Sequence, residues 1–342
     1  MNDIGRFCLR RIPLMLASLW GVITVAFLLV AAVPSNPARA VAGTFATKAE
    51  IAQISKNLGL NHSLWTRYID YWKDLVHGSL GQSIYAPTSV MSQIGQLLPS
   101  TLELIILSLI FGGSLGIGLG AVSAYYHRRW PDRISSSVVG VMQAIPDFVL
   151  GVLVIYLFAY LLGILPGPEG QLSIVATPPP SVTHMILVDS LLAGQFGTFW
   201  DAAQHAILPV LTLSIVISTV FARITRAAMR DAMDSEQTSF ARACGLPERQ
   251  VVCYALLSSR TPIMTYTAII FGALFGGTAI VETIFNWNGL SQWAVQAMLK
   301  NDYPEIQGFV LVIGVITLSV YFLLDLATGI LDPRVRTIGA GT

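Results

Sequence analysis

The side chains best suited to chemistry in this sequence are three acids set among apolar residues. Glu103, Asp147 and Glu282 each lie within or next to a long run that carries no other charge. Ionisable groups at membrane depth usually face a cavity or a partner. Each acid is therefore a candidate for lining a path across a membrane.

Each acid also has a simpler interpretation. Glu103 lies one turn into a helix expected to begin near Pro99, where the helix dipole favours a negative charge. Asp147 follows Pro146 and is an ordinary N-terminal acid if its helix starts there. Glu282 either lines the outer mouth of a pore or is a solvated helix end. The sequence leaves these alternatives open.

Basic residues are concentrated in residues 222–262, which hold six Arg and no Lys. Helix-spaced small and basic residues run to a break at Gly245-Leu246-Pro247, and a second helical pattern leads to Pro262. Only 11% of the chain is charged. Such a segment either fixes the orientation of the protein in a membrane or binds another protein.

Several kinds of catalytic site are absent from the sequence. A phosphate-binding loop needs Gly-Lys followed by Ser or Thr, and none of the four Lys follows a Gly. There is also no metal-ligand cluster and no HExxH pair. We therefore expect no enzyme activity, no ATPase site and no cofactor on this chain. A net charge of +1 gives no reason to expect a nucleic-acid partner.

The composition defines the elements that hold these residues. With 54% hydrophobic residues the chain is too apolar for a soluble domain. A spanning helix needs about 20 apolar residues. The sequence predicts an all-α membrane protein with six transmembrane helices at 12–33, 100–125, 134–163, 204–225, 261–283 and 307–330.

The distribution of Lys and Arg predicts the orientation of these helices. With the N-terminus inside, fourteen Lys and Arg fall on the cytoplasmic side and six on the other. Positive charge favours the cytoplasmic side, so both termini are expected there. The cytoplasmic parts are then 1–11, a short loop between the spans 100–125 and 134–163, 226–260 and 331–342, and the external parts are 34–99, 164–203 and 284–306.

Two further patterns bear on packing. Five glycines between Gly112 and Gly120 predict that the second span lies inside the bundle, since small residues let helices approach closely. An aromatic helical pattern around Trp65 and Tyr68 predicts a helix at the external membrane interface. That helix either touches a delivery protein or caps the bundle.

The segment from Ala241 to Arg249 resembles a known motif. It reads ARACGLPER, close to the Ala-Arg-Ala-Lys-Gly-Leu-Ser-Glu-Arg coupling loop of membrane subunits of binding-protein-dependent ABC transporters. More narrowly, the chain resembles the oligopeptide/dipeptide permease family. Further similar blocks occur in order along the chain: Leu58-Gly59-Leu60, Gly78-Ser79-Leu80-Gly81, Ile145-Pro146, Asp189 to Gly194, His205 to Pro209, Trp287 to Leu290, Asp302-Tyr303-Pro304 and Leu331 to Arg334.

The resemblance implies a type I ABC importer permease-like bundle in the bacterial cytoplasmic (inner) membrane. Implied partners are a second homologous permease subunit, two ATP-binding subunits that hold ATP and Mg, and an external solute-binding protein. The implied cargo is a di- or oligopeptide, although the family also includes importers of nickel chelates, glutathione and saccharides. The alternative is a stand-alone secondary carrier or channel, which the scattered intramembrane acids, without opposed basic groups, favour less.

The resemblance also implies which residues touch the ATP-binding subunits. In the implied contact, small side chains permit close approach while Arg242 and Arg249 pair with acids of the partner. The implied contact residues are Ser239, Phe240, Ala241, Arg242, Ala243, Gly245, Leu246 and Arg249.

Overall fold

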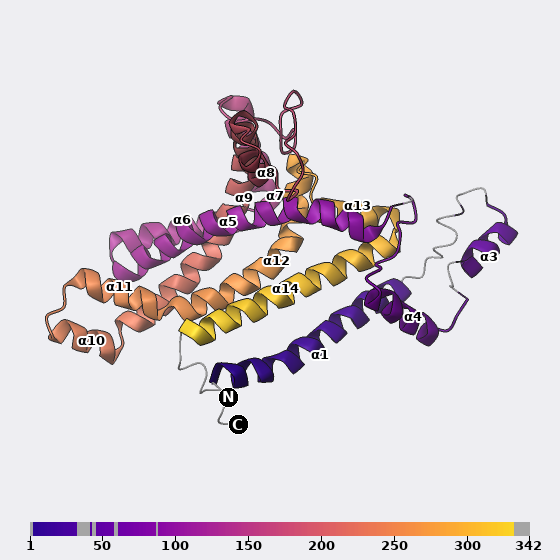
Figure 1. The fold of residues 1–342 in the computed structure, drawn as a ribbon. Helices are drawn as coiled ribbons and strands as arrows, with labels where there is room; N and C mark the ends of the chain where they lie inside the picture. The colour runs from indigo at the N-terminus through magenta and orange to yellow at the C-terminus, as the bar shows by residue number, and fades with distance from the viewer. Residues whose placement is uncertain (1–2, 33–41, 43–45, 58–60, 87, 332–342) are drawn as a thin grey trace.

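The computed structural model describes residues 3–32, 42, 46–57, 61–86 and 88–331. The expected tail after Leu331 and part of the first external segment lie outside the described residues. The described part contains helices and no strand (Figure 1). In chain order these are α1 (Asp3–Ala32), α3 (Lys48–Asn57), α4 (Leu64–Val76), α5 (Val90–Tyr125), α6 (Trp130–Ala144), α7 (Asp147–Ile155), the π-helical η1 (Tyr156–Leu161), α8 (Ile186–Leu192), α9 (Phe196–Met233), α10 (Glu236–Ala243), α11 (Glu248–Ser258), α12 (Arg260–Phe285), α13 (Leu290–Lys300) and α14 (Tyr303–Leu331).

The predicted class, an all-α membrane protein, is confirmed. Among the described residues, five helices are long and apolar enough to cross a membrane: α1, α5, α9, α12 and α14. A sixth span exists if α6 and α7–η1 are taken as one, but the two are bent by 97°. The bend falls at Pro146, which has no N–H to donate and holds Ile145 in an extended conformation.

α5 and α9 exceed their predicted lengths by more than the other spans do. α5 has 36 residues and begins ten residues before the expected start at 100, and α9 has 38 and runs from Phe196. At 1.5 Å per residue each is more than 50 Å long, whereas a bilayer core is about 30 Å thick. Both helices therefore project beyond the membrane.

α5 packs closely against α9. Three glycines, one turn apart, line the contact: Gly112, Gly116 and Gly120. A Cβ at these positions would lie 2.5–2.7 Å from a backbone carbonyl oxygen of α9, so only glycine fits. The predicted close packing of the second span is confirmed on this face, whereas Ile110 and Phe111, 55% and 59% exposed, lie on an outward face of α5.

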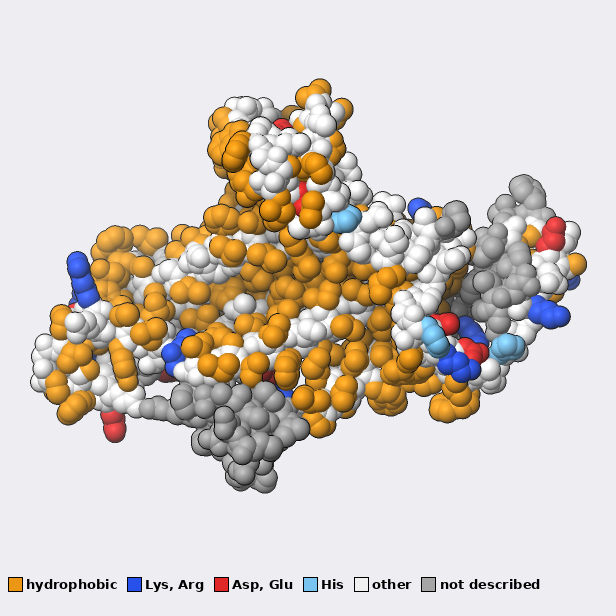
Figure 2. Space-filling model, in the orientation of Figure 1, with side chains coloured by type: hydrophobic (Ala, Val, Ile, Leu, Met, Phe, Trp, Pro, Cys, Tyr) orange, Lys and Arg blue, Asp and Glu red, His pale blue; other side chains and the backbone are white. Residues whose placement is uncertain are grey.

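The bundle has two different ends. α10 and α11 form one end, and α4 and α13 lie at the opposite end (Figure 1). The flank between them is covered mostly by hydrophobic side chains, and most visible charges gather toward the ends (Figure 2). This distribution is that of a protein whose middle lies in lipid.

Candidate coupling surface and buried acids

The short helix α10 is fastened to the end of α9. The side chain of Ser235 caps α10 by accepting from the backbone N–H of Thr238 at 3.4 Å. The hydroxyl of Thr238, which is 1% exposed, donates to the carbonyl oxygen of Ala232 at 2.6 Å. A displacement of α10 must therefore also move α9.

The break after α10 is built on Gly245. Its φ is +78°, a left-handed conformation that side chains with a Cβ disfavour. Its N–H donates to Arg242 O at 2.9 Å, and the N–H of Leu246 donates to Ala241 O at 3.2 Å. This is a Schellman helix ending. The sequence predicts a break here, and the geometry explains why it contains a glycine.

The segment Ser239–Arg249 lies almost entirely in solvent. Phe240 is 71% exposed and Leu246 is 41% exposed, while Ala241 is half-buried. Apolar side chains grouped at the surface among polar residues are typical of a protein-binding site. The expected contact residues therefore form one continuous and accessible surface, which we term the α10 surface.

Arg242 already has a partner within this chain. Its guanidinium donates to the Glu248 carboxylate at 3.0 Å from Nη2 and 3.3 Å from Nε. This hydrogen bond raises the pKa of Arg242 above its usual range. The geometry differs from the expectation of a partner's acid, because Arg242 braces α10 against α11. Arg249 is exposed.

A buried acid that the sequence did not single out connects α9 to the α5–α6 turn. Asp132 is 4% exposed and accepts from Ser123 Oγ at 2.5 Å. Arg226, two turns before the end of α9, lies 2.8 Å from the same carboxylate. Asp132 and Arg226 are 94 residues apart, so local spacing gives no signal for this pair.

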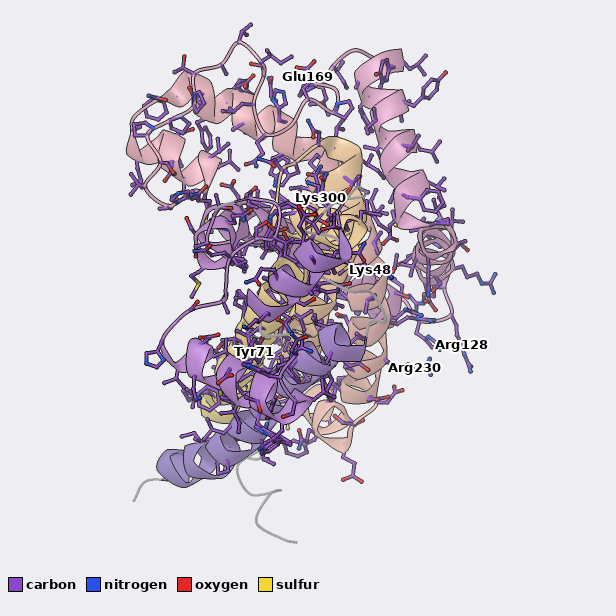
Figure 3. The ribbon with its side chains drawn as sticks, turned by 90° about the vertical axis from the view of Figure 1, so that its right-hand side faces the viewer. Lys48, Tyr71, Arg128, Glu169, Arg230 and Lys300 are labelled. Atoms are coloured by element: carbon purple, nitrogen blue, oxygen red, sulfur yellow. The ribbon has the colours of Figure 1, made fainter. Side chains whose placement is uncertain are left out.

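A second contact reinforces this connection. The guanidinium of Arg230 contacts the ring of His127. The backbone N–H of Arg128, whose φ is +61°, donates to Asp132 at 2.9 Å. Arg128 and Arg230 lie at the same edge of the bundle (Figure 3). The cluster of Ser123, His127, Asp132, Arg226 and Arg230 is termed the α9 clasp.

Glu282 is the centre of a buried network at the opposite end. Its side chain is fully buried and accepts from Thr101 Oγ1 at 2.6 Å and from the N–H of Gln292 at 2.7 Å. A Cβ at Gly289 would lie 2.5 Å from its carboxyl carbon. Glu282 is thus not a solvated helix end. It joins α5, α12 and α13.

Glu103 has a comparable position on α5. It is 5% exposed and accepts from the N–H of Leu187 at 3.1 Å, at the start of α8. Asp189 on α8 is also buried. Burial alone would raise the pKa of Asp189, but hydrogen bonds from Thr183 and its neighbours hold that pKa below the usual value. α8 is therefore held by two buried acids.

Asp147 is the half-buried first residue of α7, at the bend between α6 and α7. Within the described part of the chain, none of the three predicted acids is hydrogen-bonded to another. The structure places Glu103 and Glu282 in separate networks and leaves Asp147 at a helix start. A pathway role for these acids stays a prediction.

The fold defines a class: a multi-span integral membrane protein with an exposed loop between α9 and α11 at one end. Residues 116–337 match the family described as binding-protein-dependent transport system inner membrane component. Residues 4–105 match the N-terminal region of the membrane components of such systems.

Curated relatives match nearly the whole chain. It is 36% identical to the probable D,D-dipeptide transport system permease protein DdpB of Escherichia coli K12, over 92% of this chain and 93% of the relative. It is 32% identical to the dipeptide transport system permease protein DppB of Alkalihalophilus pseudofirmus, over 96% and 99%. A glutathione transport system permease protein, GsiC of Escherichia coli O6:H1, is 30% identical over 96% and 98%. The chain belongs to the peptide permease family of ABC transporter membrane subunits.

Proposed function

We propose that this chain forms half of the translocation pore of an ATP-driven importer. The other components are a second homologous permease subunit, two ATP-binding subunits and an external solute-binding protein. The observation that carries the proposal is the exposed α10 surface in a chain that lacks a phosphate-binding loop. ATP and Mg are then bound by the partner subunits, and their conformational change on ATP binding is transmitted to this chain through α10.

The proposed location is the bacterial cytoplasmic (inner) membrane, with both termini and the α10 surface in the cytoplasm. The excess of Lys and Arg on that side supports this orientation. The lipid bilayer surrounds the hydrophobic flank, and no nucleic acid takes part.

In the proposed mechanism, closure of the ATP-binding subunits moves α10. The hydrogen bonds of Ser235 and Thr238 pass this movement to α9. The α9 clasp then passes it to α5 and α6, because Asp132 and Arg226 pair across the three helices. The bundle switches between inward- and outward-facing forms as the three helices move together.

The proposed cargo is a di- or oligopeptide. The relatives named above are permeases of D,D-dipeptide, dipeptide and glutathione transport systems, and glutathione is itself a small peptide. The resemblance assigns most of the selectivity to the separate binding protein, so the permease needs only a path of suitable width.

Reconstitution in liposomes tests the proposal. The four-component complex, supplied with ATP on the α10 side and a dipeptide-loaded binding protein on the other, should take up peptide. Omission of ATP or of the binding protein should abolish uptake. If this chain alone takes up peptide in response to a proton gradient, it is a secondary carrier and the proposal is wrong.

A further inference from the structure

Toward the α10 end, α1 and α14 pack directly against each other. There, the Arg11 guanidinium contacts the Asp325 carboxylate. Midway along, Gly314 faces Val22, and a Cβ at Gly314 would lie 2.4 Å from a Val22 methyl. Toward α4, in contrast, two cavities follow one another along the same pair of helices.

The cavity nearer the middle of α1 and α14, termed the deeper cavity, has a volume of about 370 Å³ and an almost wholly apolar lining. Its rim includes Val76 and Met91, which are 79% and 48% exposed. The cavity therefore opens onto the hydrophobic flank of the bundle. The walls come from α1, α4 and α14 and include Leu19, Ile23, Trp72, Leu75, Leu311 and Val315.

The outer cavity, of about 450 Å³, lies about one helical turn farther along the same two helices. Phe27 and Gln307 line it, and each lies four residues from a wall residue of the deeper cavity. The phenol oxygens of Tyr71 and Tyr303 are buried and have no hydrogen-bond partner among the described residues. Tyr303 is 5% exposed. A buried polar atom without a partner is costly, so a ligand that supplies one is favoured.

The charges around the outer cavity are balanced. Asp70 pairs with Lys73 at 2.8 Å, which leaves Arg67 and Asp74 as a cation and an anion on one face of α4. Neither is in an ion pair within the described part of the chain. Tyr71, labelled in Figure 3 and placed between Arg67 and Asp74 along α4, packs its ring against Phe27 of α1. A ligand with one negative and one positive group complements this lining.

We propose that the two cavities together bind one phospholipid with a zwitterionic headgroup. Its phosphate lies at Arg67, its amine at Asp74, and an acyl chain fills the deeper cavity. An amphiphile is the ligand class that matches a polar cavity next to an apolar one on the same pair of helices. A protein segment docked from outside the membrane would leave the apolar cavity empty. The inference requires only that the chain resides in a bilayer and does not depend on import.

Native mass spectrometry of the purified full-length chain tests the site, after extraction from membranes that hold phosphatidylethanolamine and phosphatidylglycerol. The wild type should retain one phosphatidylethanolamine. Arg67→Gln and Asp74→Asn should each lower its retention at least ~fivefold, since each removes one charge-assisted hydrogen bond. Val315→Trp should remove it by filling the deeper cavity.

Two matched controls should retain lipid as the wild type does. Lys56→Gln removes a cation on α3, and Leu323→Trp enlarges a 60% exposed position elsewhere on α14. No retained lipid, equal retention in all variants, or a preference for phosphatidylglycerol overturns the proposal. If Val315→Trp fails to fold, Arg67→Gln and Asp74→Asn still show whether the site binds the lipid headgroup. The readout involves neither ATP nor uptake, so its failure is distinct from failure of the import proposal.

Discussion

Acidic and aromatic side chains are buried around Glu282 at one end of the bundle and exposed at the α10 surface at the other end. Around Glu282, an acid, a hydroxyl and a backbone N–H are joined in a network that excludes solvent, and the adjacent Trp287 is 2% exposed. At the α10 surface, Phe240 is 71% exposed and the acid Glu248 meets Arg242 in solvent. The Glu282 network is closed by α5, α12 and α13, whereas the α10 surface presents apolar side chains that the described residues leave uncovered.

This difference in burial predicts that the Glu282 network contributes mainly to folding stability and the α10 surface mainly to coupling with the ATP-binding subunits. Buried hydrogen-bonded groups contribute to folding because an unpaired partner is costly, whereas solvent-exposed pairs contribute little. Substitutions near Glu282 should therefore lower stability, and substitutions on the α10 surface should impair transport by a folded protein. The following predictions test that separation in order of decreasing effect.

The largest effect is expected from Glu282→Ala. The change leaves the Thr101 O–H and the Gln292 N–H without an acceptor and opens a cavity, which should cost about 2–5 kcal/mol of unfolding free energy. Glu248→Ala, the control at the other end, should cost less than about 1 kcal/mol. Thermal unfolding in detergent measures both. Equal losses of stability would contradict the contrast between the ends.

Gly289→Ala should have the next largest effect. Its Cβ would lie 2.5 Å from the Glu282 carboxyl carbon, so the acid must shift from its donors. We expect a loss of about 1–3 kcal/mol, as for other overpacked sites. Gly276→Ala on α12, with nothing within 4 Å of the new methyl, is the matched control. The prediction fails if the two variants unfold at the same temperature.

Substitutions of Gly245 test the role of the α10 surface. Gly245→Ala places a Cβ at φ +78° and should cost about 1–2 kcal/mol locally. Because the loop lies in solvent, the unfolding temperature of the bundle should change little while ATP-driven uptake falls. Gly245→Asn, which tolerates the left-handed conformation, should retain more uptake. Identical uptake by the two variants would show that the turn geometry is not what transport requires.

The smallest effect is expected at the exposed ion pair of Arg242 with Glu248. If Arg242 acts as a brace, Arg242→Gln and Glu248→Gln should weaken binding of the ATP-binding subunits equally, by about 0.2–1 kcal/mol. If instead Arg242 pairs with an acid of the partner, only Arg242→Gln should weaken it. Titration of the subunits onto the reconstituted chain distinguishes the two.

Local sequence patterns predicted the features that depend on neighbouring residues. Apolar runs indicated the spans, the glycines of α5 indicated a close helix contact, and Gly245 indicated a break. The bend at Pro146 was missed because the apolar run continues through it. The Arg242–Glu248 pair, six residues apart, was within reach of sequence reasoning.

Contacts between distant segments could not be predicted in this way. Thr101 and Glu282 are separated by 181 residues, and Asp132 and Arg226 by 94. In the sequence each acid is an isolated charge, because its hydrogen-bond donors lie in distant segments that only the fold places next to it. A single sequence therefore locates a buried acid but does not distinguish a pathway group from the centre of a hydrogen-bond network.

Two native cysteines offer the most direct test of docking at the α10 surface. Cys244 lies within it and Cys253 lies on α11, and both are exposed free thiols. In a Cys8→Ser background, the rates of maleimide labelling at both sites are compared with and without the ATP-binding subunits. Docking predicts that the subunits slow labelling of Cys244 at least ~tenfold when bound at saturation, and that of Cys253 much less. If the complex forms and Cys244 still reacts at its original rate, the α10 surface is not the docking site.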